Sequence, residues 1–100
     1  MKPHRLKIGM DFDETFTEDE VMWSSIIRMM KAVGHEVKFV TWRRPDADNS
    51  DIELAAKHVG IPVVYCSGTA KMKCYAADIW IDDSPYAIVC HAKWASFQDD

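Results

Sequence analysis

Residues 8–15 of the chain read IGMDFDET, and this stretch decides the fold. An apolar run ends at Asp11, and Asp13 follows two positions later. A short apolar run bounded by polar residues is typical of a buried strand. Because side chains alternate along an extended backbone, the two carboxylates are expected to point the same way. The stretch therefore predicts a strand over residues 5–10 that presents a pair of acids beyond its end.

The rest of the chain alternates further apolar runs with helical patterns. Strands are predicted over residues 36–40, 61–65 and 79–81, helices over 18–33, 50–59 and 85–94, and a short helix or turn over 69–76. This alternation predicts an α/β fold, Rossmann-like and three-layered, with a parallel sheet of about four strands. One domain is expected over residues 1–100, because a chain of this length supports a single core.

The predicted helix over residues 18–33 has recognisable ends and an apolar period. Thr17 is expected to cap its N-terminus, and Gly34 to follow its C-terminus. Its apolar residues recur with helical spacing at Val21, Met22, Ile26, Met29, Met30 and Val33. Of these, Met22, Met29 and Met30 are expected to pack in the core. Trp80 and Trp94 are further candidates for the core.

Composition narrows the class of protein. The net charge is −4, so no strong nucleic-acid-binding surface is expected, although a nucleic-acid end remains open as a substrate. No apolar run approaches the ~20 residues that span a bilayer, so no membrane partner is expected. The basic start lacks the apolar segment of a secretion signal.

The cysteines indicate a reducing location. Cys66, Cys74 and Cys90 are an odd number, which argues against a disulfide framework and favours the cytoplasm. Together with His91 they do not have the spacing of a zinc site. Buried structural thiols are the favoured interpretation.

A second acidic pair, Asp82 and Asp83, ends the predicted strand over residues 79–81. In parallel sheets, ligands bind beyond the carboxyl ends of the strands. If the two acid-bearing strands are neighbours, four carboxylates converge and require a cation, and oxygen ligands suit Mg²⁺. Taken singly, each pair is also compatible with a helix cap or a turn.

These motifs, taken in order, resemble those of the haloacid dehalogenase (HAD) superfamily. Asp11-Phe-Asp13-Glu-Thr resembles the first motif, and Thr41 at the end of Val37-Lys-Phe-Val resembles the second. Lys71 in Ser67-Gly-Thr-Ala-Lys resembles the third, with Lys73 as the alternative. Asp82-Asp83 after Ile79-Trp-Ile resembles the fourth. The second acid of the first motif, Asp13, is typical of the phosphatases in this superfamily.

The resemblance implies a phosphohydrolase, a phosphomonoesterase that acts through an aspartyl-phosphate. Asp11 would be the nucleophile and Asp13 the proton donor and acceptor. Thr41 would bind a phosphoryl oxygen, and Lys71 would offset negative charge.

The resemblance also implies a Mg²⁺ site. Its ligands would be the Asp11 carboxylate, the Asp13 backbone carbonyl and Asp82. Asp83 would bind the ion through water or accept a hydrogen bond beside the ligands.

The spacing of the motifs leaves no room for a cap domain, so an open site is expected. Such a site suits an accessible phosphate or a homo-oligomer in which a second copy supplies the missing wall. Trp42, Arg43 and Arg44 follow Thr41 and would hold a nucleobase or a second phosphate, or else form a solvated loop. The expected substrate is a phosphorylated small molecule or nucleotide.

The alternative function is an HAD-like module that binds phosphate or metal, or regulates a partner, without turnover. A receiver domain is disfavoured, because no aspartate ends the predicted strand over residues 61–65.

Overall fold

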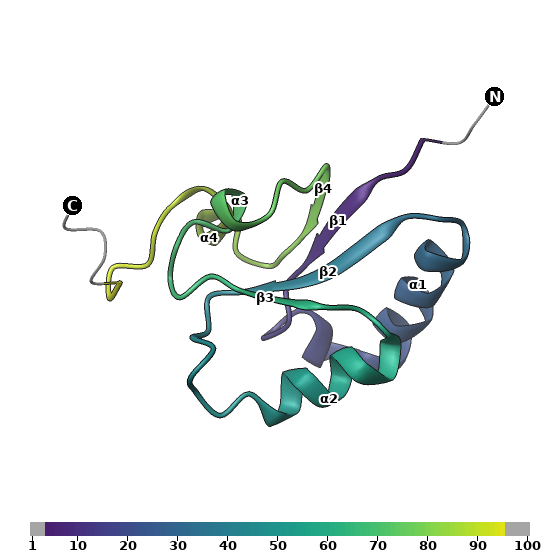
Figure 1. Ribbon diagram of the computed structural model, residues 1–100, viewed down its shortest axis with the longest axis horizontal. Coiled ribbons are helices and arrows are strands. Elements are labelled where there is room, and N and C mark those ends of the chain that lie inside the picture. The colour runs from purple at the N-terminus through teal and green to yellow at the C-terminus, as the bar shows by residue number, and fades with distance from the viewer. Residues whose placement is uncertain (1–3, 96–100) are drawn as a thin grey trace.

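The computed structural model describes residues 4–95, which form a four-stranded parallel sheet flanked by helices (Figure 1). The strands are β1 (Lys7–Met10), β2 (Glu36–Thr41), β3 (Val63–Tyr65) and β4 (Ile79–Ile81). The helices are α1 (Glu20–Ala32), α2 (Ser50–Val59), α3 (Lys71–Cys74) and α4 (Pro85–Val89), and Phe16–Glu18 form a 3-10 turn, η1. The prediction of an α/β fold with a small parallel sheet is confirmed.

Helices lie on both sides of the sheet, the longer α1 and α2 on one side and the short α3 and α4 on the other (Figure 1). The main core fills the space between the sheet and α1 and α2. Its largest fully buried side chains include Phe16, Phe39, Met10, Ile27 and Ile52. A smaller cluster on the opposite face joins Val40, Cys66 and Tyr75, with Trp80 packed against it.

The order of the strands, β3-β2-β1-β4, creates a crevice next to β1. The chain runs from β1 outward through β2 to β3 and then returns to the other side of β1 as β4. The connections that leave β1 and β4 therefore diverge, which is where α/β proteins bind ligands. The backbone N–H of Asp11 donates to the carbonyl of Ile81 over 2.8 Å, so the ends of β1 and β4 are held together.

Close packing explains one glycine in β1. A Cβ at Gly9 would lie 2.5 Å from Cζ3 of Trp80 on the neighbouring strand. The Trp80 indole thus crosses β1 where only a glycine leaves room. Trp80 is half-buried, as a partner of the smaller cluster.

The start of α1 differs from the prediction, whereas its end agrees. Asp19, not Thr17, is the N-cap, and its carboxylate accepts a hydrogen bond from the Met22 backbone N–H over 3.1 Å. The residues just before Asp19 form η1, so the α-helix cannot begin at residue 18. Gly34 follows the C-cap as predicted, with a φ of +100° that favours glycine.

The predicted core face of α1 is wrong in part. The exposed side chains are Val21, Met22, Met29 and Val33, while Ile26 and Met30 are half-buried. Ile27 and Ser24 are the buried residues of this helix. Apolar residues lie on two faces of α1, so the period could not select the buried one.

The chain after β4 also departs from the prediction. Helix α4 ends at Val89, and the residues that follow turn back, with the Ala92 N–H donating to the Gly68 carbonyl over 2.7 Å. Trp94 is consequently 55% exposed rather than in the core.

The cysteines are free thiols, but the prediction that they are buried holds for one of them. Cys66 is buried, Cys90 is half-buried and Cys74 is exposed. Within residues 4–95, no helix combines the length and apolar character needed to cross a membrane.

Candidate active site

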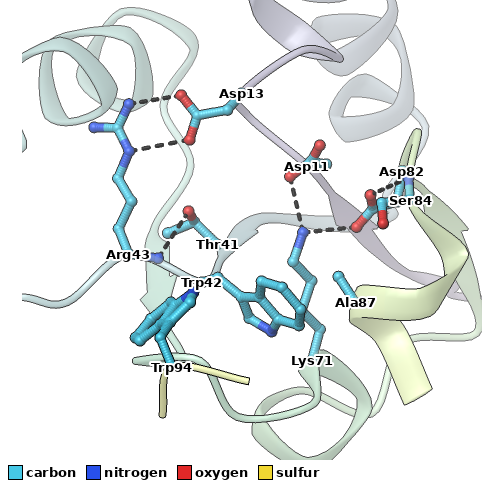
Figure 2. Close-up of a pocket in the computed structure, with 10 residues that line it drawn as sticks. All are labelled: Asp11, Asp13, Thr41, Trp42, Arg43, Lys71, Asp82, Ser84, Ala87 and Trp94. Carbon is cyan, nitrogen blue, oxygen red and sulfur yellow. Dashed lines mark hydrogen bonds and ion pairs between the residues drawn. The ribbon is translucent and has the colours of Figure 1, made fainter. Parts of the chain in front are cut away.

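A buried ion-pair triad lies where β1 and β4 end (Figure 2). The ammonium of Lys71, the first residue of α3, donates to Asp11 Oδ1 over 2.8 Å and to Asp82 Oδ2 over 2.7 Å. The exposed fractions of the Lys71 and Asp82 side chains are 3% and 1%. We call Asp11, Lys71 and Asp82 the buried triad. Its members lie after β1, at the start of α3 and after β4, so the fold holds each in place.

Burial and charge act in opposite directions on this triad. Burial raises the pKa of Asp11 to about 6, although the hydrogen bond and charge of Lys71 act to lower it. For Lys71, burial acts to lower the pKa, but the hydrogen bonds to Asp11 and Asp82 outweigh it and the pKa is raised. Lys71 is therefore a cation at neutral pH.

Three carboxylates, which we call the carboxylate cluster, gather just beyond the ends of β1 and β4. Asp11, Asp82 and Asp83 each offer an oxygen, and these oxygens lie within 4.8 Å of one another. The Thr15 hydroxyl lies 2.9 Å from Asp11 Oδ2 and 3.2 Å from Asp83 Oδ1, and links the two acids. When all three acids are ionised, the single ammonium of Lys71 leaves an excess of negative charge. An oxygen-only cluster with this excess fits a hard divalent cation such as Mg²⁺.

Asp13 belongs to a second, more exposed triad. Arg43 donates from Nη2 to Asp13 Oδ1 over 2.7 Å and from Nε to Asp13 Oδ2 over 3.1 Å. It also bonds both oxygens of Asp51, on the first turn of α2, over 2.6 Å and 2.9 Å. We call Asp13, Arg43 and Asp51 the exposed triad. Figure 2 shows the Asp13 carboxylate turned toward Arg43, so both its oxygens are already engaged.

Arg43 is fixed by more than its two acids. Its guanidinium lies 5.3 Å from the centre of the Phe12 ring, a cation–π contact. The guanidinium lowers the pKa of Asp51 to about 2 through their hydrogen bonds. These hydrogen bonds, first to Asp51 and then to Asp13, raise the pKa of Arg43.

All of the buried triad, and Asp13 and Arg43 of the exposed triad, line one cavity of about 310 Å³. Its lining consists of Asp11, Asp13, Thr41, Trp42, Arg43, Lys71, Asp82, Ser84, Ala87 and Trp94. Thr41, the last residue of β2, is buried, and its hydroxyl accepts a hydrogen bond from the Arg43 N–H over 3.2 Å. The hydroxyl hydrogen remains available to a ligand.

The structure brings most of the predicted site residues to this cavity. Asp83 is not a lining residue, but its carboxylate lies beside those of Asp11 and Asp82, which are. Lys71 rather than Lys73 is the lysine that lines the cavity. Lys73 is exposed. Arg44 is not among the lining residues, and its side chain is exposed beside Asp46 at 3.8 Å. The Asp13 carboxylate lies outside the carboxylate cluster, and the assignment of its backbone carbonyl to a metal stays a prediction.

Sequence reasoning did not identify Asp51 or Trp94, nor the lining residues Ser84 and Ala87. Asp51 looks like an ordinary acid in the first turn of a helix, because its pairing with Arg43 depends on the loop after β2. Trp94 was placed in the core because α4 was expected to reach it. The residues between Pro85 and Trp94 carry no signal for a return toward the cavity.

The geometry defines an α/β protein with a carboxylate, lysine and threonine pocket at the switch point of a parallel sheet. Comparisons of the chain with models of known families, with curated proteins and with solved structures found no match.

Proposed function

We propose that the protein is a capless, HAD-like phosphomonoesterase that depends on Mg²⁺ and acts through an aspartyl-phosphate on Asp11. The observation that carries this proposal is the hydrogen bond between the Asp11 carboxylate and Lys71. Both residues line the same cavity as Thr41. A carboxylate beside a fixed cation and a hydroxyl donor is suited to attack a phosphate and to hold its oxygens.

In the first step, a carboxylate oxygen of Asp11 attacks phosphorus. The bond between this oxygen and phosphorus forms while the ester bond from phosphorus to the leaving oxygen breaks. The leaving oxygen takes a proton from Asp13 and departs as an alcohol. For this, the Asp13 carboxyl group has to leave the hydrogen bonds to Arg43 that it makes in the present arrangement.

In the second step, water attacks the aspartyl-phosphate at phosphorus. The bond from the water oxygen to phosphorus forms, and the bond from phosphorus to Asp11 breaks. Asp13 takes the proton that the water loses, which restores both carboxyl groups and releases inorganic phosphate. Asp13 thus gives and regains one proton in each cycle.

Two other residues of this chain orient the reacting groups. Lys71 holds the Asp11 carboxylate through Oδ1 and offsets negative charge on the transferred phosphoryl group. Thr41, fixed by the end of β2, donates its free hydroxyl hydrogen to a phosphoryl oxygen.

The carboxylates of Asp11, Asp82 and Asp83 would hold Mg²⁺, together with the Asp13 backbone carbonyl. When bound, the ion supplies positive charge that offsets the negative charge of the phosphoryl group.

A second candidate function is a module that binds phosphate or metal without turnover. It is favoured by one observation, the engagement of both Asp13 oxygens by Arg43. If that contact persists when a phosphate is bound, Asp13 cannot serve the leaving oxygen.

An assay of phosphate release tests the proposal. Wild type and Asp11→Asn are given p-nitrophenyl phosphate and a panel of phosphorylated metabolites, with Mg²⁺ or with EDTA. The control is Asp46→Asn, which removes an exposed acid outside the cavity. We expect release by wild type and the control with Mg²⁺ only, and none by Asp11→Asn. Release that survives in Asp11→Asn would contradict the proposal, and binding without release by any form would favour the second candidate.

A further inference from the structure

Two tryptophans form one wall of the cavity, away from Asp13 (Figure 2). The rings of Trp42 and Trp94 are 6.4 Å apart between centroids and nearly perpendicular, at 86°. Tyr86 is not among the lining residues, but its ring packs beside this wall, 6.5 Å from that of Trp42. We call Trp42 and Trp94 the aromatic wall. Aromatic side chains beside a charged pocket are outside the phosphoryl chemistry described above, so they call for a separate explanation.

The aromatic wall is held in place before any ligand binds. The Trp42 indole N–H donates to the Thr69 carbonyl over 2.9 Å, which fixes the orientation of the ring. Trp94 lies over Gly68, where an added Cβ would come within 3.0 Å of its Cη2 atom. The glycine therefore lets this indole rest against the backbone of the loop that precedes α3. A ring fixed in this way loses little conformational entropy when a planar ligand stacks on it.

The wall has exposed aromatic surface at the mouth of the cavity. Trp94 is 55% exposed, whereas Asp11, which lines the same cavity, is buried. Because the two indoles are nearly perpendicular, a planar ring that stacks on one lies nearly perpendicular to the other. The separation of the buried carboxylate from the exposed rings suits a ligand whose phosphate and flat group are joined by a spacer.

Size and charge limit the ligand further. A cavity of about 310 Å³ is at the small end of the roughly 300–1,000 Å³ found for small-molecule sites. The basic residues of its lining, Arg43 and Lys71, are each bonded to two carboxylates. Among the lining residues, no further cation is left to follow a polynucleotide backbone, on which nucleic-acid affinity depends.

We propose that the aromatic wall stacks the base of a nucleoside monophosphate whose phosphate lies at Asp11. The ribose is the spacer between the buried carboxylate and the exposed rings. The inference rests on the proposed phosphatase function and adds the class of substrate.

The test compares substrates that differ only in the base. The ratio of kcat/KM for a nucleoside 5′-monophosphate to that for ribose 5-phosphate is measured for wild type, Trp94→Leu and Trp94→Phe. Leucine keeps an apolar side chain but removes the flat ring, whereas phenylalanine keeps a ring. The matched control is Met72→Leu, at an exposed apolar residue of α3 outside the cavity.

We expect wild type and Met72→Leu to share a ratio above one. Trp94→Leu should lower this ratio roughly 5- to 150-fold, with a smaller decrease for Trp94→Phe, because base stacking on one aromatic ring contributes this much to binding. A wild-type ratio of one, or a ratio that Trp94→Leu leaves unchanged, overturns the inference. A kcat/KM that is higher for O-phosphotyrosine or for a 5′-phosphorylated oligonucleotide overturns it as well, in favour of those substrates.

A binding measurement separates failure of this inference from failure of the phosphatase proposal. Calorimetric titrations of Asp11→Asn with the nucleotide and with ribose 5-phosphate report base recognition without turnover. Tighter binding of the nucleotide, lost when Trp94→Leu is added, supports the aromatic wall even if no form of the protein releases phosphate. Equal dissociation constants for the two ligands overturn it.

Discussion

The buried triad and the exposed triad share one pattern, a cation between two carboxylates, in opposite environments. In the buried triad, the side chains of Lys71 and Asp82 are 3% and 1% exposed. In the exposed triad, the side chains of Asp13 and Asp51 are 52% and 59% exposed. Residues of both triads line the same cavity, so the difference between the triads lies in how far water competes with the ion pairs.

This difference separates a part of the site that is held rigidly from a part whose ion pairs can open. Removing one member of a buried ion pair leaves an uncompensated charge away from water, which is costly. Exposed ion pairs contribute little, because water solvates the charges when the pair opens. The candidate nucleophile Asp11 is thus held rigidly, whereas Asp13 can leave Arg43 at small cost when a leaving oxygen needs its proton.

The largest effect is expected from the buried triad. Lys71→Met leaves Asp11 and Asp82 without their cation and should lower the free energy of unfolding by about 3–5 kcal/mol at neutral pH without metal. Chemical denaturation measures this loss. The matched control, Lys73→Met, removes an exposed lysine of the same helix and should change stability by less than about 0.5 kcal/mol. Equal losses in the two variants would contradict the claim that the buried ion pairs of Lys71 are costly to break.

Magnesium should stabilise the protein through the buried triad and not through the exposed triad. Saturating Mg²⁺ at about 100 times its dissociation constant should stabilise wild type by ~2.7 kcal/mol, seen as a rise in Tm. The rise should vanish in Asp82→Asn, which removes an oxygen of the carboxylate cluster, and persist in Asp51→Asn. A rise of the same size in both variants would place the ion elsewhere.

Opening the exposed triad should be much less costly. Arg43→Gln removes the cation between Asp13 and Asp51 but leaves both acids in water, so a loss of about 1 kcal/mol or less is expected. The same denaturation experiment provides the comparison with Lys71→Met. A loss as large as that of Lys71→Met would mean that Asp13 is held too firmly to exchange protons with a substrate.

The smallest effect is a pH dependence of the exposed triad. The pKa of Asp51 is lowered to about 2 in the folded chain, so its contribution to stability is present above the ordinary aspartate value near 3.8. This contribution disappears as the pH falls from there toward 2. Asp51→Asn should therefore be less stable than wild type at pH 5, by less than about 1 kcal/mol, with the difference shrinking toward pH 2. Thermal unfolding across this range checks it, with Asp46→Asn as the control, and a difference that grows on acidification would contradict the assignment.

The buried triad was accessible to sequence reasoning, whereas the exposed triad was not. Asp11 and Asp82 each end an apolar strand, and the carboxyl ends of neighbouring parallel strands meet, so their approach followed from local patterns. The bond between Arg43 and Asp51 depends on the course of the loop that joins β2 to α2, for which the residues give no period.

The helices show the same contrast. The bounds of α2 were predicted correctly, because its C-terminal stop is a glycine, Gly60, with a φ of +73°. The buried face of α1 was not, since apolar residues such as Met29 and Ile27 lie on opposite sides of it. Trp94 was misplaced for another reason, because a long-range hydrogen bond from Ala92 to Gly68 turns the chain back.

The most direct test of the central claim is to trap the phosphorylated residue. Wild-type protein is mixed with Mg²⁺ and a substrate that it hydrolyses, quenched, and treated with borohydride, which reduces an acyl phosphate to an alcohol. Peptide mass spectrometry then locates the change. Conversion of Asp11 to homoserine, dependent on substrate, is the result that we predict. Phosphate release with an unmodified Asp11, or with the modification on another carboxylate, would contradict the claim that Asp11 is the nucleophile.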